Sequence, residues 1–255
     1  MSSLNHLLSG PEETPVLVLG SSLGTTLSMW DPELEALGRR HRLLRFDHRG
    51  HGGSPAPPGP WEIADLGRDV LELLDSLGLA RVSYAGVSLG GMVGMWLAAN
   101  APERIERLVI ICSSAHLPPA QAWAHRAEAV IAAGSVGAVS ATVLERWFTP
   151  AFAKERPEVM SWMDAMLRAC PPVGYAGCCG AIERLDLRDQ LSAITAPTLV
   201  IAAAEDLSPP PEHSELIAAA IPAAALEVLE HGAHLVAVER PDEVSALIDR
   251  HLEDA

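Results

Sequence analysis

The chain has 255 residues, of which 49% are hydrophobic and 20% are charged. This length and composition predict one α/β domain with a large core, and they exclude a mainly disordered chain. Acidic residues outnumber basic residues 33 to 18, and the resulting net charge of -15 disfavours binding to nucleic acid and to anionic membranes. An anionic small molecule would need a local cationic group in its binding site, so the positions of the arginines are of interest.

The cysteines and the amino-terminal segment indicate the cellular compartment of the protein. The four cysteines form no C-x-x-C pair, and reduced thiols in a core are expected for them. The first residues lack the pattern of a secretion signal, and no stretch reaches the roughly 20 consecutive apolar residues of a membrane span. We therefore expect a cytoplasmic protein.

Short apolar segments alternate with longer amphipathic segments along most of the chain. The apolar segments predict strands at residues 16–19, 43–46, 82–85, 108–112, 198–202 and 226–229. Helical patterns lie between them, as in residues 63–77 and 88–100. This alternation predicts a mostly parallel, twisted sheet with helices on both faces.

The strand pattern stops between residues 117 and 190, where helical segments follow one another and are interrupted by glycine and proline. We interpret residues 117–190 as a helical cap inserted between two strands. The predicted core then comprises residues 1–116 and 191–255.

A G-x-S-x-G motif, Gly86 to Gly90, joins the predicted strand 82–85 to the predicted helix 88–100. This spacing is typical of a nucleophile elbow, in which a strained turn lifts the serine hydroxyl above the sheet and the flanking residues must be small. A glycine-rich turn with a serine N-cap is the simpler alternative, but the strand and the helix on either side favour the elbow. Ser88 is therefore the candidate nucleophile.

A serine nucleophile needs a base that an acid orients, and in such a fold they follow in the order Ser, Asp or Glu, His. Asp206 lies just after the predicted strand 198–202 and His234 after the strand 226–229, so both are expected at the carboxyl edge of the sheet. Glu205 and His231 are the competing acid and base. We favour Asp206 and His234, the latter because Gly232 allows the turn to present it.

Acyl transfer also needs backbone amides that bind the oxyanion. One is the amide of the residue after the nucleophile, here Leu89. The other comes from the loop after an early strand, residues 20–25 with the sequence GSSLGT, and we assign it to Leu23. A simple glycine-rich turn is the alternative for this loop.

The predicted cap carries aromatic and cationic side chains that could contact a substrate. The candidates are Trp123, Arg126, Trp147 and Arg184. Arginine is singled out because its guanidinium pairs with a carboxylate in a bidentate manner. The alternative for the aromatic residues is packing in the core. The alternative for the arginines is an exposed position in solvent.

Residues 47–54, with the sequence DHRGHGGS, combine an aspartate with two histidines. They could suggest a metal site, but further ligands are lacking, and a turn held by Asp47 and Arg49 is favoured. We expect no metal site here.

Taken together, these residues resemble the α/β-hydrolase superfamily and, within it, the 3-oxoadipate enol-lactonases of the protocatechuate branch of aromatic degradation. The similar motifs extend over almost the whole chain and include SLGT at 22–25, GVSLGGMVGMWLAANAPE at 86–103, ERWFTP at 145–150 and APTLVIA at 196–202. The chain departs from the family pattern at Gly20-Ser21, at residues 114–116 and at Pro209.

The resemblance implies an α/β-hydrolase fold and a carboxylic ester hydrolase that opens the enol-lactone of 3-oxoadipate to 3-oxoadipate with a Ser-His-Asp triad. It implies catalysis without a metal or an organic cofactor, on a small-molecule lactone or ester, in the β-ketoadipate pathway. A homo-oligomer is compatible with the sequence.

Other activities share such a triad. A cofactor-free carboxylesterase, a C–C bond hydrolase or a perhydrolase is the nearest alternative, and a substrate panel would separate them. Serine at position 88 argues against haloalkane dehalogenase and epoxide hydrolase chemistry. The resemblance to this superfamily implies an aspartate nucleophile at that position for those two activities. A non-catalytic binding protein on the same fold is a second class, which tight ligand binding without turnover would reveal.

Overall fold

The computed structural model describes residues 4–253. Within this range, seven strands form one sheet in the order β1-β3-β2-β4-β5-β6-β7. Neighbouring strands are parallel except β1 and β3, which pair antiparallel. The strands are β1 (His6–Ser9), β2 (Val16–Gly20), β3 (Arg42–Phe46), β4 (Val82–Val87), β5 (Ile105–Ile111), β6 (Thr198–Ala203) and β7 (Ala225–Leu229). The predicted mostly parallel sheet is confirmed.

The strands differ in burial according to their place in the sheet. Every residue of the central strands β4 and β6 is buried, since helices cover both faces. The edge strand β1 alternates between half-buried and exposed residues. This strand is absent from the sequence-based prediction, because four residues that include only two leucines give a weak periodic signal.

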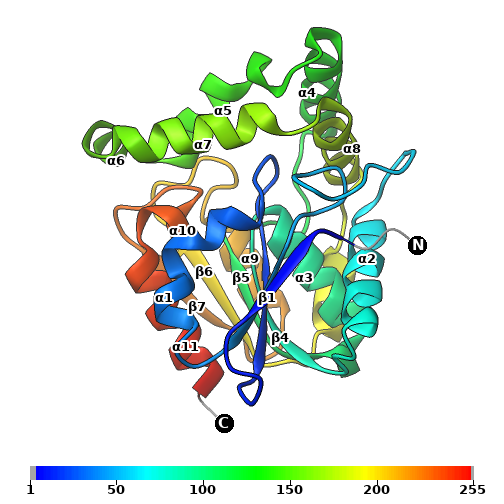
Figure 1. Cartoon of the computed structure of the whole chain (residues 1–255), viewed down its shortest axis with the longest axis vertical. Coiled ribbons are helices and arrows are strands. Elements are labelled where there is room, and N and C mark those ends of the chain that lie inside the picture. Colours follow the sequence, from blue (N-terminus) through cyan, green and yellow to red (C-terminus); the bar gives the residue numbers. More distant parts are fainter. Residues whose placement is uncertain (1–3, 254–255) are drawn as a thin grey trace.

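Helices lie on both sides of the sheet, with α2 and α3 on one side and α1 and α11 on the other (Figure 1). Outside the cap the helices are α1 (Leu34–Leu37), α2 (Ile63–Ser76), α3 (Leu89–Asn100), α9 (Glu212–Ala220), α10 (Val236–Glu239) and α11 (Pro241–Glu253). Short 3-10 helices are η1 (Leu27–Glu33), η2 (Pro102–Arg104) and η4 (Arg188–Ala193). Within residues 4–253, no helix is both long and apolar enough to cross a bilayer.

A layer of helices follows β5 and precedes β6 in the chain, and it lies across one end of the sheet (Figure 1). It consists of α4 (Ala120–Ala133), η3 (Val136–Ala138), α5 (Ser140–Trp147), α6 (Pro150–Glu155), α7 (Pro157–Ala169) and α8 (Pro172–Glu183). We call α4 to α8 the cap. Helix α4 packs against α8.

Candidate active site

Ser88 occupies the turn between β4 and α3, with φ of 55° and ψ of -113°. A side chain in this region of backbone space is strained, as a nucleophile elbow requires. Neighbouring groups hold the turn, since the Ser88 N–H donates to the Ile111 carbonyl at 2.9 Å and the Ser113 hydroxyl donates to the Ser88 carbonyl at 2.7 Å. The end of β5 and the residues that follow it thus hold the serine in place.

The glycines that flank Ser88 are required by close backbone contacts. A Cβ atom on Gly86 would lie 2.3 Å from the carbonyl carbon of Gly90. A Cβ atom on Gly90 would lie 2.2 Å from the carbonyl oxygen of Gly20. Real Cβ atoms do not approach backbone atoms so closely. A side chain at Gly86 would therefore push β4 away from the first turn of α3, and one at Gly90 would push α3 away from the end of β2.

Asp206 and His234 form a buried pair below the cap. The Nδ1 atom of His234 lies 2.9 Å from Oδ2 of Asp206, and the two residues are 4% and 2% exposed. The other carboxylate oxygen of Asp206 accepts a hydrogen bond from the Ser208 N–H at 2.7 Å. Asp206 therefore holds the imidazole in one orientation and, through Nδ1–H, leaves Nε2 free to accept a proton.

The competing acid and base lie elsewhere. Glu205 and His231 are exposed, and they face each other at 3.9 Å on the surface. Neither residue lines the cavity that contains Ser88 and His234. The geometry therefore favours Asp206 and His234 as the partners of Ser88.

The loop after β2 lies against the elbow, as the oxyanion prediction for Leu23 requires. The Ser21 carbonyl accepts a hydrogen bond from the Gly90 N–H at 3.0 Å, so the loop is joined to the first turn of α3. Leu23 lines the same cavity as Ser88. Leu89 is the first residue of α3, and its N–H has no acceptor within the helix.

Two buried histidines from the loop after β3 support the loop that carries Leu23. His51 Nε2 accepts a hydrogen bond from the Gly24 N–H at 2.9 Å, and His48 Nε2 lies 3.0 Å from the Ser21 carbonyl, to which it donates. Burial, together with the neighbouring His51, lowers the pKa of His48 to about 3. Burial also lowers the pKa of His51, so both rings are neutral at pH 7.

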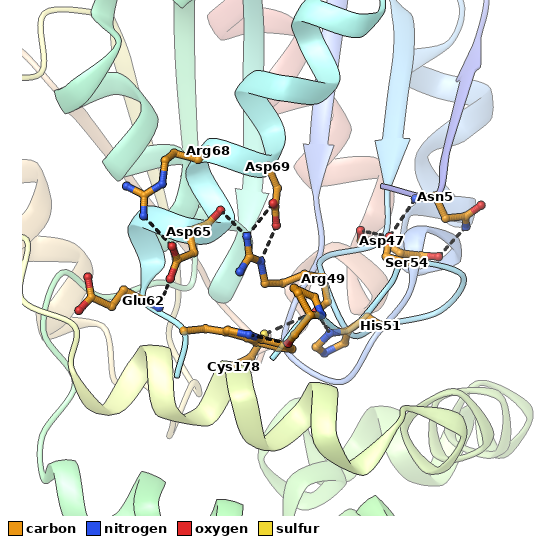
Figure 2. A network of polar contacts seen from close by, with 12 residues as sticks. Asn5, Asp47, Arg49, His51, Ser54, Glu62, Asp65, Arg68, Asp69 and Cys178 are labelled. Carbon is orange, nitrogen blue, oxygen red and sulfur yellow. Dashed lines mark hydrogen bonds and ion pairs between the residues drawn. The ribbon is translucent and has the colours of Figure 1, made fainter. Parts of the chain in front are cut away.

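Figure 2 shows how the rest of this loop is tied to its surroundings. Asp47 accepts hydrogen bonds from the Asn5 side chain at 2.6 Å and from the Gly53 N–H at 2.9 Å, and Arg49 forms a bidentate pair with Asp69 at 2.5 and 2.6 Å. The thiol of Cys178, on α8, donates to the Arg49 carbonyl at 3.9 Å. The loop is thus the turn held by Asp47 and Arg49 that the sequence favoured. Across residues 4–253, no cluster of three or more His, Cys, Asp or Glu side chains is placed to hold a metal ion.

A cavity separates the elbow from the cap. It contains about 440 Å³ of empty space, part of which is open to solvent. Its floor includes Ser22, Leu23, Ser88, Met92 and His234, and its roof includes Trp123, Arg126, Val143, Arg146, Trp147 and Tyr175. Ser88 and His234 thus line the same cavity as three of the four substrate contacts predicted in the cap, which are Trp123, Arg126 and Trp147.

The cavity contains two arginines without a carboxylate partner. Within residues 4–253, most arginines form ion pairs, but Arg126 and Arg146 form none. The Arg126 guanidinium lies 4.6 Å from the centre of the Trp123 ring. It also contacts the hydroxyl of Tyr175, where it opposes the rise in the pKa of Tyr175 that burial causes. An anion in the cavity would therefore meet cationic groups that are free to bind it.

The fourth predicted contact, Arg184, does not line this cavity. Its guanidinium donates to the Trp61 carbonyl and lies 3.7 Å from Glu183, beside a separate surface hollow near α2. It directly follows the last residue of α8, at the end of that helix that contacts Trp61. Arg146 lines the cavity instead, and the sequence analysis did not name it although it belongs to the ERWFTP motif.

Comparisons with known proteins identify relatives over nearly the whole chain. The model of the alpha/beta hydrolase fold family matches residues 15–241. A 3-oxoadipate enol-lactonase of Acinetobacter baylyi is 37% identical over 94% of this chain and 89% of its own length. A protein of Variovorax paradoxus that is named for carbamate hydrolysis is 32% identical over 98% of this chain and 95% of its own length.

A solved structure gives the same result in three dimensions. The enol-lactonase of Burkholderia xenovorans superposes with a TM-score of 0.96 at 36% sequence identity, and the match covers 98% of this chain and 96% of that one. The superposition therefore includes the cap as well as the sheet.

Proposed function

Because the chain belongs to the alpha/beta hydrolase fold family and is related to the 3-oxoadipate enol-lactonases, we propose that it is a serine hydrolase that opens the enol-lactone of 3-oxoadipate. This choice of substrate rests on one observation: Arg126 and Arg146, which form no ion pair with a carboxylate of residues 4–253, line the cavity that contains Ser88. The enol-lactone carries an acetate side chain, whose carboxylate matches a guanidinium. A lactone without this charge would leave both groups unused.

The proposed reaction begins with proton transfer from the Ser88 hydroxyl to Nε2 of His234. The Ser88 oxygen attacks the lactone carbonyl carbon, and the amides of Leu23 and Leu89 bind the oxyanion. Asp206, 2.9 Å from Nδ1, stabilises the imidazolium that forms. Collapse of the intermediate breaks the bond to the ring oxygen, which leaves as an enolate. The enolate takes the proton from the His234 imidazolium, which restores the neutral base, and the resulting enol tautomerises to the ketone.

The second half of the reaction releases the product. His234 removes a proton from a water molecule, which attacks the acyl carbon attached to Ser88. The ester bond to Ser88 breaks, the serine oxygen recovers a proton from His234, and 3-oxoadipate leaves as a dicarboxylate. Each step uses groups of the chain and water.

The test is the loss of ultraviolet absorbance of freshly prepared 3-oxoadipate enol-lactone on addition of the purified protein. We expect kcat/KM of about 10⁴ M⁻¹s⁻¹ or more for the wild-type protein. For Ser88→Ala we expect a loss of several orders of magnitude, because removing a triad member costs that much in well-studied cases.

Two outcomes would contradict the proposal at different levels. Near-normal turnover by Ser88→Ala would refute the triad scheme. Triad-dependent hydrolysis of p-nitrophenyl acetate or of a small carbamate, without turnover of the lactone, would keep the scheme and refute the substrate. The carbamate is included because the Variovorax paradoxus relative is named for that activity.

A further inference from the structure

Glu239 is a buried carboxylate at the end of α10, and the proposed reaction does not use it. The residue is 7% exposed. Its Oε2 atom accepts a hydrogen bond from the Ala233 N–H at 3.0 Å. Its Oε1 atom accepts from the Thr149 N–H at 3.3 Å and also from the Thr149 hydroxyl. One carboxylate thus receives three donors from two segments that are far apart in the chain.

These donors lie close in sequence to residues that line the active-site cavity. Ala233 directly precedes His234, and Thr149 lies two residues after Trp147, which lines the cavity. A further hydrogen bond runs in parallel, since the Leu235 N–H donates to the Trp147 carbonyl at 2.9 Å. The loop that carries the base is therefore joined to the cap on both sides of His234, once directly and once through Glu239.

Burial of a carboxylate at this position costs free energy, which its hydrogen bonds offset. Burial raises the pKa of Glu239, and the hydrogen bonds from Thr149 and Ala233 oppose that rise. An apolar side chain would avoid the cost of burying a charge, but it would leave the Ala233 and Thr149 donors without this acceptor. The carboxylate therefore holds the segments of Ala233 and Thr149 together.

We propose that Glu239 is a positioning residue that holds the His234 loop against residues 147–149 of the cap, so that the base and the Trp147 wall of the cavity are set together. The proposal rests on the proposed role of His234 as the base. A displacement of about 1 Å at a reacting group can cost as much as about a hundredfold in rate. Loosening of this loop should therefore lower kcat.

The first test is Glu239→Gln, which keeps the size of the side chain but offers only one oxygen. The amide nitrogen that replaces one carboxylate oxygen cannot accept a hydrogen bond, so either the Ala233 N–H or the Thr149 N–H loses its acceptor, and only the Thr149 hydroxyl can reverse its role and accept from the amide. With p-nitrophenyl acetate we expect kcat to fall about tenfold and KM to change less than about twofold, in protein shown to be folded by circular dichroism. Glu155→Gln is the matched control, since Glu155 is exposed and lines a surface hollow together with Glu239. It should leave both constants unchanged.

The second test uses the partner residue. Thr149→Val removes the hydroxyl donor and should also lower kcat, whereas Thr149→Ser retains the donor and should restore it to within about twofold of wild type. Thr149 also caps α6 by accepting from the Phe152 N–H at 3.2 Å, so Thr149→Val has a second effect. A double-mutant cycle with Glu239→Gln removes that effect, because it is common to both backgrounds. We expect the two losses in kcat to be non-additive.

The outcomes separate this proposal from the proposed function. Normal kcat in folded Glu239→Gln, or additive losses in the cycle, would overturn the positioning role, as would a lower melting temperature with unchanged kinetics. If Glu239→Gln does not fold, Thr149→Asp compared with Thr149→Ser decides the question, because aspartate keeps an acceptor for the Phe152 N–H but offers no donor to Glu239. Equal kcat in these two variants would overturn the positioning role. Activity in Ser88→Ala would instead refute the triad scheme on which both proposals depend.

Discussion

Two guanidinium groups beside Ser88 distinguish the cavity from the rest of a strongly acidic protein. With 33 acidic and 18 basic residues, the average surface repels an anionic substrate, so local cations must provide its attraction. Arg146 is exposed at the cavity, while Arg126 is half-buried against the Trp123 ring. Arg146 is therefore open to solvent, whereas Arg126 packs on an aromatic ring.

Substitution of these arginines should affect substrates according to their charge. For Arg146→Ala we expect KM for the enol-lactone to rise about tenfold or more, because a hydrogen bond between charged groups contributes about 1.5 to 3 kcal/mol. KM for a neutral ester such as p-nitrophenyl acetate should change little. Arg126→Ala should act in the same direction, with additional losses from its contacts with Trp123 and Tyr175.

The matched control is Arg81→Ala. Arg81 is exposed and directly precedes β4, so it lies at the opposite end of that strand from Ser88. Steady-state kinetics on both substrates should match wild type. Equal KM for the lactone in Arg146→Ala, Arg126→Ala and wild type would show that the carboxylate is bound elsewhere.

At the scale of elements, the loop after β3 acts as a support for the loop after β2. His51 accepts from the Gly24 N–H and His48 donates to the Ser21 carbonyl, so two neutral rings contact the loop on either side of Leu23. The ring of His51 lies edge-on to that of His48, with centroids 6.4 Å apart. The position of the Leu23 amide therefore depends on side chains that belong to a different strand connection.

Removal of the acceptor at His51 should weaken binding of the oxyanion. We expect His51→Phe to lower kcat for the lactone about tenfold with little change in KM, because the loop that carries the Leu23 amide loses one of its supports. His51→Gln, whose Oε1 can accept from the Gly24 N–H, should recover most of that loss. Affinity for a trifluoromethyl ketone inhibitor, which forms an oxyanion on Ser88, should fall in parallel with kcat. Unchanged inhibitor affinity in His51→Phe would contradict this support.

At the scale of the whole molecule, the core contains a buried carboxylate that makes stability depend on pH. Glu33, at the end of η1, is fully buried, and within residues 4–253 neither of its carboxylate oxygens has a hydrogen-bond partner. Burial raises the pKa of Glu33 well above its ordinary value of 4.5. The folded state therefore binds this proton more tightly than the unfolded state does.

It follows that the contribution of Glu33 to stability is fully present below pH 4.5 and is lost as the pH rises toward the folded-state pKa. Glu33→Gln removes this titration. The melting temperature of the variant minus that of wild type should increase with pH above 4.5. The difference in the free energy of unfolding grows by up to about 1.4 kcal/mol per pH unit, and each kcal/mol corresponds to roughly 2–4 °C in melting temperature. Glu35→Gln, at an exposed position, should show a constant difference, and a constant difference in Glu33→Gln would contradict the argument.

The sequence by itself was sufficient for the parallel strands β2 to β7, though not for the edge strand β1, and for the elbow and the order of the three candidate triad residues. Burial on both faces makes a central strand apolar at nearly every position, and this local property is readable without coordinates. The G-x-S-x-G turn is likewise local, since the clash that Gly86 avoids is with Gly90 only four residues away. Asp206 and His234 follow strands, and parallel strands end at one edge of the sheet.

Tertiary structure decided what depends on contacts between distant segments. Only packing of the cap on the core shows that Arg126 and Arg146 line the cavity while Arg184 lies beside Trp61. The connection from Glu239 to Thr149 spans 90 positions and has no periodic signal. The direction of a side chain on a cap helix follows from how that helix is rotated against its neighbours, which the local sequence does not specify. Strands and turns are encoded over a few residues, whereas the walls of the cavity are set by the fold as a whole.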